Sequence, residues 1–246
     1  MSLTKIVSQV IEILKIPRAR ISFKNYDQNT KDNYIKVYNY FTKRHRLKIV
    51  RNKTIGVMLI DINAFSAFEE YYKSINGKNS AAYYHRKAIN RGYKFIQIDR
   101  NDYVDDIYEI NTSAEYRQDK KMTNSYLQKI DKFENLSNYK YFGVINQNGK
   151  LLSYICLGFY GEFLIYDQLL GHNNFLNDGI MYLMVIELNR LIFNEHQKLT
   201  NFNEYKMWKD VRYIMYDTFF GASDGLKMFK KKLGFAPYKV QWIWEK

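Results

Sequence analysis

Residues Arg212 to Pro237, RYIMYDTFFGASDGLKMFKKKLGFAP, decide the fold. The apolar run Arg212 to Thr218 predicts a buried strand, and the glycine-containing stretch Phe219 to Asp224 predicts a loop that crosses to the next element. Gly225 to Leu233 has the spacing and the lysines of a basic amphipathic helix, which ends at the following glycine. A last strand, bounded by a proline, follows. This order of strand, loop, helix and strand indicates a mixed α/β fold.

The segment that leads into this stretch, from Tyr139 onward, alternates with a period of two. Asn148-Gly149 lies between two β-rich runs, Tyr141 to Ile145 and Leu151 to Phe159, and therefore predicts a hairpin. Glu162 to Leu170 predicts a third strand, and Ile180 to His196 predicts a long buried helix. The segment therefore predicts a central mixed sheet flanked by helices.

Residues 1–137 also switch between helical and strand patterns. The predicted helices are Leu3 to Leu14, Asp32 to Arg44, Ser66 to Ser74, Ser80 to Arg91 and Tyr103 to Asn111. The predicted strands are LKIV and TIGVMLIDI, joined as a hairpin by Arg51-Asn52-Lys53, and YKFIQID. No linker rich in proline, glycine or serine follows. We therefore expect a packing boundary near residue 137, between an N-terminal region (1–137) and a C-terminal domain (138–246).

The composition is that of a folded, basic protein. Apolar residues make up 46% of the 246 residues, and the net charge is +13. The single cysteine, Cys156, excludes a disulfide framework and favours a reducing compartment. The N-terminus lacks a signal-peptide pattern, and the most apolar stretch is shorter than the roughly 20 residues of a membrane span. We expect a soluble, cytoplasmic protein without a membrane span, and the charge favours phosphate-bearing or polyanionic partners.

The loop Gly171 to Gly179 joins a strand end to a helix start. A helix N-terminus presents free backbone N–H groups that bind phosphate, so Asn177, Asp178 and Gly179 either bind a cofactor or form an ordinary helix cap. His172 lies beyond the carboxyl end of a strand, where ligands bind in open α/β sheets. His172 is a candidate general base; the alternative is that it has no catalytic role.

Further candidates lie at a strand end and in a polar loop. Asp217, which follows Tyr216, is placed to orient a substrate amine or to take its proton; the alternative is a cap of the next loop. Tyr116, Arg117 and Gln118 lie in a loop that either covers a cleft and holds a phosphate or carboxylate, or is simply solvated.

Lys230 belongs to a run of helix lysines that either screens a phosphate tail or forms the solvated face of the helix. No phosphate-binding P-loop, dinucleotide-binding glycine motif or serine-hydrolase elbow occurs in the sequence. Its cysteine and histidines lack the spacing of metal ligands, so no metal is expected.

The segment from Tyr139 onward resembles the acyl-CoA N-acyltransferase (GNAT) superfamily. It looks most like the Fem-type branch, whose members transfer aminoacyl groups from tRNA. The motifs that carry this resemblance are Tyr216-Asp217, Gly225-Leu226, Phe229-Lys230 and Leu233-Gly234-Phe235. The resemblance implies a GNAT-like fold, with residues 1–137 as a degenerate second copy or a specificity region.

Two departures from the superfamily pattern bear on the donor. The glycine-rich pyrophosphate loop is absent, and Asn177-Asp178-Gly179 stands in its place. Many acetyltransferases use a tyrosine to protonate the CoA thiolate, and Lys230 stands at that position here.

Three functions follow as hypotheses. The first is transfer of an acetyl or other acyl group from acyl-CoA to a primary amine, with an amino-sugar on a nucleotide or glycan as the preferred acceptor. In it, His172 or Asp217 acts as base, Asn177 to Gly179 and Lys230 bind acetyl-CoA, and Tyr116, Arg117, Gln118 and Tyr216 bind the acceptor. The second is Fem-like transfer from aminoacyl-tRNA, which the net charge favours. The third is non-catalytic binding of nucleic acid.

Overall fold

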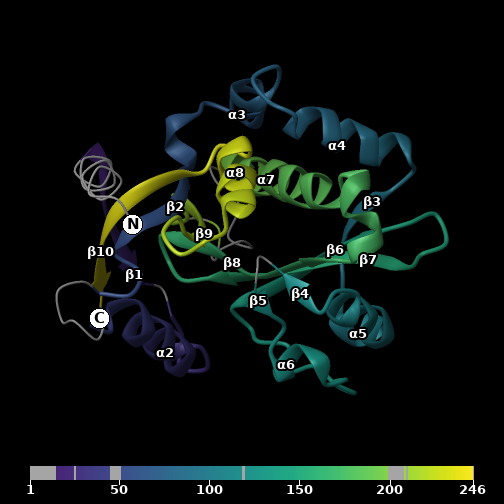
Figure 1. The fold of residues 1–246 in the computed structure, drawn as a ribbon. Helices are drawn as coiled ribbons and strands as arrows, with labels where there is room; N and C mark the ends of the chain where they lie inside the picture. Colours follow the sequence, from purple (N-terminus) through teal and green to yellow (C-terminus); the bar gives the residue numbers. More distant parts are fainter. Residues whose placement is uncertain are drawn as a thin grey trace, which may run out of the picture.

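The sheet at the centre of the molecule takes strands from both ends of the chain. The computed structural model describes residues 15–24, 26–44, 51–117, 120–198, 208 and 210–245, and within these residues eight strands form one sheet (Figure 1). In order across the sheet they are β1 (Arg18–Phe23), β10 (Ala236–Trp244), β2 (Ile55–Asp61), β9 (Tyr213–Thr218), β8 (Phe163–Gly171), β7 (Leu151–Phe159), β6 (Tyr139–Ile145) and β3 (Lys94–Gln97).

Strands from before and after residue 137 pair with one another in this sheet. β1 pairs with β10, β2 lies between β9 and β10, and β3 pairs with β6. The TIGVMLIDI segment is therefore an interior strand whose described partners are distant in sequence, whereas LKIV, its predicted hairpin partner, lies outside the described residues. Whether residues 1–137 form a domain of their own stays a prediction.

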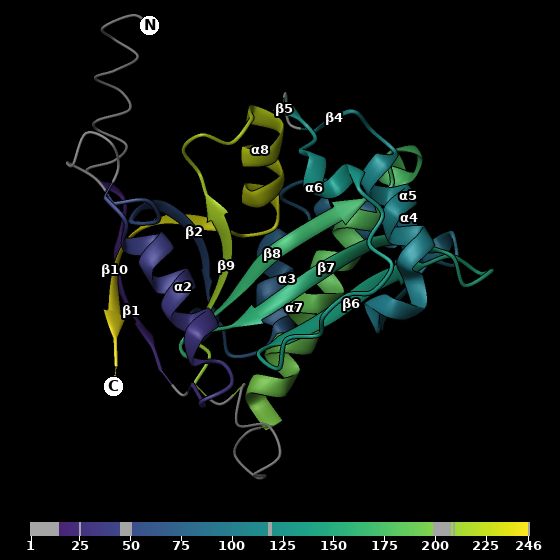
Figure 2. The same cartoon turned by 90° about the horizontal axis from the view of Figure 1, so that it is seen from below.

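Helices cover both faces of the sheet (Figures 1 and 2). One face carries α3 (Phe68–Ile75), α4 (Ala81–Asn90), α7 (Ile180–Lys198) and α8 (Asp224–Lys232). The other carries α2 (Lys31–Thr42), α5 (Val104–Thr112) and the short α6 (Asn124–Leu127). Three 3-10 turns are η1 (Ile62–Ala64), η2 (Arg100–Tyr103) and η3 (Asn173–Asp178), and β4 (Tyr116–Arg117) pairs with β5 (Lys120–Lys121) as a small hairpin.

The core is built around β7 and α7. Every residue of β7 is buried, because helices cover both of its faces. Burial of each leucine or isoleucine side chain of β7 contributes roughly 1.5–3 kcal/mol to the stability of the fold. The buried side of α7 packs on the same core and holds Asn189, which is fully buried and hydrogen-bonds Tyr71 and Tyr166. This rigid layer fixes the position of β8 beside it.

β8 and β9 are parallel but pair over only three residues each, Phe163–Ile165 with Tyr213–Met215. Beyond these residues the two strands diverge, and Figure 2 shows them as a V with α8 at its open end. Past this pairing the two strands make no ladder hydrogen bonds with each other and face a gap in the sheet, although each stays paired with its other neighbour. This divergence is the feature of the fold that creates the candidate site.

The predicted elements from Tyr139 onward are confirmed, with ends that shift by one or two residues. The Asn146 side chain accepts the backbone N–H groups of Asn148 and Lys150, and Gly149 has a φ of +80°, which fixes the predicted hairpin turn. The polar loop after α5 contains the β4–β5 hairpin instead of being wholly irregular. The predicted helix Leu3 to Leu14 lies outside the described residues. No helix in the described part of the chain is long and apolar enough to cross a membrane.

Candidate active site

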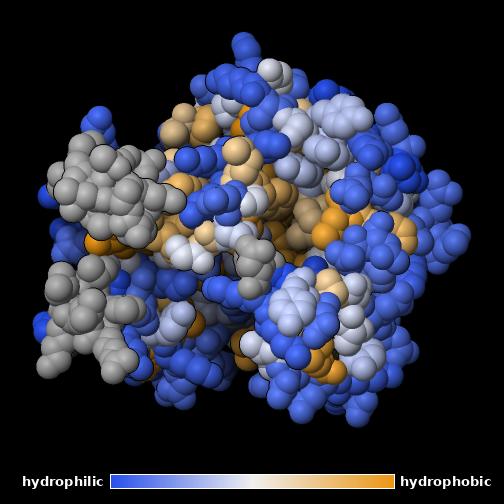
Figure 3. Space-filling view, viewed as in Figure 1, coloured by the Kyte–Doolittle hydropathy of each residue, from blue (hydrophilic) through white to orange (hydrophobic). Residues whose placement is uncertain are grey.

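A cavity of about 620 Å³ opens between the diverging ends of β8 and β9. Its walls come from these two strands, the starts of η3 and α7, one side of α8 and the β4–β5 hairpin. Figure 3 shows a recess with apolar walls near the centre of this face, surrounded by hydrophilic residues. Five of its lining residues belong to the motifs that carry the Fem-type resemblance: Tyr216, Asp217, Leu226, Phe229 and Lys230.

The same dipeptide, Tyr-Asp, occurs where each strand leaves the pairing. If the register of β8 and β9 continued, Tyr166 would face Tyr216 and Asp167 would face Asp217. Side chains alternate along a strand, and both tyrosines belong to the core beneath α7 and α8. The two aspartates therefore lie on the opposite, α2-facing side. The gap in the sheet has aromatic rings on one side and two carboxylates on the other.

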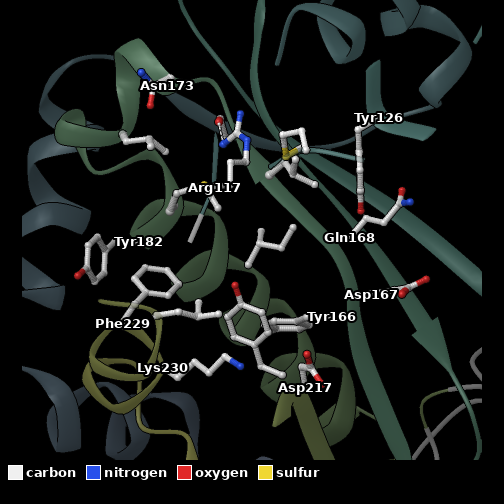
Figure 4. A pocket seen from close by; sticks show the side chains of 18 of the residues that line it. Arg117, Tyr126, Tyr166, Asp167, Gln168, Asn173, Tyr182, Asp217, Phe229 and Lys230 are labelled. Atoms are coloured by element: carbon white, nitrogen blue, oxygen red, sulfur yellow. Dashed lines mark hydrogen bonds between the residues drawn. The ribbon is translucent and has the colours of Figure 1, made fainter. Parts of the chain in front are cut away.

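Lys230 is a buried cation on the aromatic side of this gap. Figure 4 shows it extending from α8 toward the end of β9, where Asp217 lies. Its Nζ donates a hydrogen bond to the carbonyl of Thr218 at 3.0 Å and lies 4.6 Å from the centre of the Tyr216 ring. Burial lowers the pKa of Lys230 to about 8, although the charge of Asp217 opposes the effect. At neutral pH the group is mostly an ammonium that is available to a nearby anion.

Asp167 faces the cavities from a densely packed strand. It accepts a hydrogen bond from the hydroxyl of Tyr139 at 3.2 Å, and that hydroxyl lies 2.8 Å from the hydroxyl of Tyr160. Burial raises the pKa of Asp167 and the charge of Asp217 adds to this, whereas the hydrogen bond from Tyr139 lowers it. A carboxylate with a raised pKa is a better proton acceptor than an ordinary one.

Asp217 differs from Asp167 in being held by a cation. Its carboxylate forms an ion pair with Lys53, from the loop before β2, and its backbone has a φ of +52°, which is unusual for a residue other than glycine. Such strain persists where the surroundings impose it. A second cavity of about 450 Å³ lies on the α2 side of the sheet and shares Tyr166, Asp167 and Asp217 with the first. The two cavities therefore meet at the gap.

The predicted loop residues lie at the edge of the first cavity. Tyr116 is exposed on its rim. Arg117 lines it too, but the guanidinium donates to the carbonyls of Gly171 and Ile110 at 2.9 and 2.7 Å, so it anchors the β4–β5 hairpin over the cavity. Burial lowers the pKa of Arg117. Gln118 lies outside the described residues.

The predicted phosphate loop faces α4 and β3. The carbonyl of Asn177 accepts from Lys87 at 2.8 Å, and the carboxylate of Asp178 accepts from the Tyr93 hydroxyl at 2.8 Å. A side chain at Gly179, whose φ is +89°, would lie 2.2 Å from the carbonyl oxygen of Tyr84. The glycine thus permits close packing on α4. Cofactor binding by Asn177, Asp178 and Gly179 stays a prediction.

Backbone donors of the same loop are already in use. The N–H groups of Asn173, Asn174, Phe175 and Gly179 donate, in turn, to the Ser113 hydroxyl, the His172 ring, the His172 carbonyl and the Leu176 carbonyl. A phosphate needs such groups free. These four N–H groups are therefore not available to a phosphate, whereas the N–H groups of the first turn of α7, which begins at Ile180, are not among them.

His172 is buried beside this loop. Its Nδ1 accepts the N–H of Asn174 at 3.2 Å, its Nε2 lies 3.3 Å from a carboxylate oxygen of Glu109, and its ring packs on Phe175. His172 is not among the described residues that line the two cavities. A catalytic role for His172 stays a prediction, and the position of its side chain does not support it.

Sequence reasoning missed Asp167. A signal was present: LIYDQ, at residues 164–168, repeats the Tyr-Asp of IMYDT, at residues 214–218, and in both cases a carboxylate interrupts an apolar strand. An aspartate in a strand interior is unfavourable unless it serves a site. The two dipeptides lie 50 positions apart, so only the parallel pairing of β8 with β9 reveals that both follow it and line the same cavity.

Comparison with known proteins bears on the fold. No protein-family model matches the chain, and no curated protein matches it. The solved structure of FemX matches with a TM-score of 0.52 and 13% identity, over 96% of this chain and 74% of that one. L-PGS from Bacillus licheniformis and a tandem GNAT protein from the clavulanic acid biosynthesis pathway match more loosely, with TM-scores of 0.46 and 0.43, identities of 13% and 12%, and coverage of 75% and 91% of this chain. The chain spans 58% and 59% of their lengths.

The fold expected from the sequence resemblance is thus confirmed. The chain has a mixed sheet flanked by helices, and its fold is of the kind found in FemX. At this level of identity the comparison concerns the fold alone, since one fold serves several chemistries.

Proposed function

We propose that the protein is a transferase that moves an aminoacyl group from the 3′ end of a charged tRNA to a primary amine, in the gap between β8 and β9. The observation that carries the proposal is the meeting of two cavities at that gap, with the ammonium of Lys230 on one side and the carboxylates of Asp167 and Asp217 on the other. Two cavities that meet at one point can hold two substrates with their reacting atoms close together, which makes the step between them effectively unimolecular.

Three observations favour a tRNA donor over acyl-CoA. The loop before α7 has committed several of its backbone N–H groups, which weakens the case for a pyrophosphate there. The Fem-type motifs, whose resemblance implies aminoacyl transfer, supply Tyr216, Asp217 and Lys230 to the cavity wall. The net charge of +13 suits a polyanionic donor. Acetyl-CoA as donor and an amino-sugar as acceptor stay as alternatives that the experiment below addresses.

The chemistry assigns one task to each charged group. Asp167 takes a proton from the acceptor ammonium, and the freed nitrogen lone pair attacks the ester carbonyl carbon, so that a C–N bond forms. The oxyanion that develops on the carbonyl oxygen is stabilised by Lys230. The ester C–O bond then breaks, the nitrogen loses its second proton to the departing ribose oxygen, and the proton on Asp167 returns to solvent.

Donor binding tests the proposal. The probe is a short RNA hairpin that ends in CCA and carries an amino acid through a stable 3′-amide; the same hairpin without the amino acid and acetyl-CoA are the comparisons. Ligand at about 100 times its dissociation constant adds roughly 2.7 kcal/mol to the stability of the folded protein, a clear rise in melting temperature. We expect the aminoacylated hairpin to stabilise the protein more than the bare hairpin, with an effect that falls as salt rises.

A protein that responds to acetyl-CoA and to neither RNA contradicts the proposal and restores the acyl-CoA hypothesis. Equal responses to the two hairpins favour nucleic-acid binding without transfer.

A further inference from the structure

The second cavity, on the α2 side of the sheet, has a chemistry of its own. We propose that it binds the acceptor as an aliphatic primary ammonium that takes the place of Lys53 at Asp217 and Asp167, and that the acceptor carries an anionic group which Lys36 holds. The inference rests on the proposed function, because it concerns the second substrate of the same gap.

An ammonium of the protein itself already occupies this position. The Lys53 Nζ is paired with the carboxylate of Asp217 and lies 5.6 Å from the centre of the Tyr40 ring. A carboxylate together with an aromatic face is a combination that recognises alkylammonium groups. Lys53 is a primary amine on an aliphatic chain, so it occupies the position with the same functional group that an acceptor would bring.

Negative charge exceeds what Lys53 pairs with on this side of the gap. Asp167 and Asp217 both line the cavity, whereas Lys53 is paired with Asp217 alone. The described partner of the Asp167 carboxylate is the neutral hydroxyl of Tyr139. Lys230 reaches the gap from the other side of the sheet and interacts with Asp217. Asp167, which no ion pair within the described residues neutralises, therefore leaves this wall attractive to a further cation.

The remainder of the wall indicates what the ammonium is attached to. Val37, Phe41 and Ile165 supply apolar surface, which suits an aliphatic chain. Lys36 lies on the exposed side of α2 at the same cavity, and no carboxylate of the described residues pairs with it. A cation there complements an anion on the acceptor, either a carboxylate or a phosphate.

The position of the carboxylates links the site to the reaction. They face α2, whereas Lys230 approaches from the α8 side. An amine bound at Asp167 would therefore present its nitrogen to the gap, opposite the cation proposed to stabilise the oxyanion. Lys53 must move away before the acceptor binds, which makes this residue a competitor of the acceptor.

The experiment measures acceptor binding in the absence of any donor. Saturation-transfer NMR compares 6-aminohexanoate, which carries both charges, with hexylamine and hexanoate, which carry one each. We expect 6-aminohexanoate to bind about threefold more tightly than hexylamine, the effect of one exposed ion pair, and hexanoate to bind much more weakly than either. Lys53→Met is expected to tighten binding of both amines severalfold, since a competing cation is removed.

Variants locate the two ends of the ligand. Lys36→Glu is expected to abolish the advantage of 6-aminohexanoate over hexylamine, whereas Lys31→Glu, an exposed lysine on the same helix that does not line the cavity, is expected to retain it. Asp167→Asn is expected to weaken both amines. Its control, Asp131→Asn, changes an exposed carboxylate that lines neither cavity.

Several results overturn the inference. If hexanoate binds the wild-type protein as tightly as hexylamine does, the inference is wrong, and no variant is needed to show it. The inference is also wrong if the Lys53→Met protein binds the amines more weakly than wild type. Loss of donor binding with intact amine binding contradicts the proposed function and leaves the acceptor site standing. Aminoacyl transfer to amines that do not compete with hexylamine contradicts the acceptor site alone.

Discussion

Replacing Lys230 provides the sharpest test, because the stability of the protein and its transfer activity should change in opposite directions. The ordinary pKa of a lysine is 10.5, whereas burial lowers that of Lys230 to about 8. The difference corresponds to about 3 kcal/mol by which the folded structure disfavours the charged form. Methionine has a similar volume and no charge. Lys230→Met removes this cost, and it also leaves the Thr218 carbonyl without its hydrogen bond, a loss of about 1–3 kcal/mol.

The pH dependence separates these terms. Between pH 8 and 10.5 the unfolded lysine holds a proton that the folded one has released, so stability rises with pH in that window. We therefore expect the unfolding free energy of wild type, minus that of Lys230→Met, to rise by about 3 kcal/mol from pH 8 to 10.5. At pH 7 the variant should equal wild type or exceed it by up to about 2 kcal/mol, while aminoacyl transfer falls by about 10²-fold or more.

Urea unfolding at a series of pH values measures the difference between the two proteins, which cancels the other titrating groups. Lys231→Met, on the exposed side of α8, is the matched control and should stay within about 0.5 kcal/mol of wild type at every pH. A constant difference between wild type and Lys230→Met from pH 7 to 10.5 refutes the reasoning. So does a Lys230→Met protein that is more than about 2 kcal/mol less stable at pH 7.

Three further outcomes are expected. Asp167→Asn keeps the fold but slows aminoacyl transfer by about 10²- to 10⁴-fold in single-turnover assays, and a normal rate would remove it as the base. Gly179→Ala should cost more stability in urea unfolding than Gly149→Ala, because the two glycines share a positive φ but only the first would place a side chain against Tyr84; equal costs would contradict the contact. Burial raises the pKa of Cys156 to about 12, so Ellman's reagent at pH 8 should label it only after unfolding, and rapid labelling of the folded protein would show an accessible thiol.

Local chemistry made much of the C-terminal half predictable. The Asn-Gly turn specifies its hairpin through side-chain hydrogen bonds within a few residues, and the apolar pattern of α7 follows from its burial. Ser223 caps α8 by accepting from the backbone N–H of Leu226, and Gly234 follows the helix with a positive φ. Such signals are readable because cause and effect lie within a few residues of one another.

Among the candidate site residues, those in a local motif line the cavity, whereas His172, chosen by its position alone, does not. Asp217 and Tyr216 were identified because they end a strand and belong to a recognisable motif, and Lys230 lies one helix further on in that motif. His172 was chosen for its place after a strand, but its ring nitrogens face Asn174 and Glu109. Position in a strand–loop pattern does not say in which direction a side chain points.

The sequence by itself determined the order of the elements, the mixed sheet and the Fem-like motifs at the C-terminus. The tertiary structure alone decided that β2 enters the sheet between β9 and β10, that Asp167 lies beside Asp217, and that Lys53 and α2 complete a second cavity. The physical reason is that these relations depend on strand pairings between residues 50 to 221 positions apart. Hydrophobic burial drives those pairings, and it has no direction in sequence, so the partner of each strand emerges only when the whole core assembles.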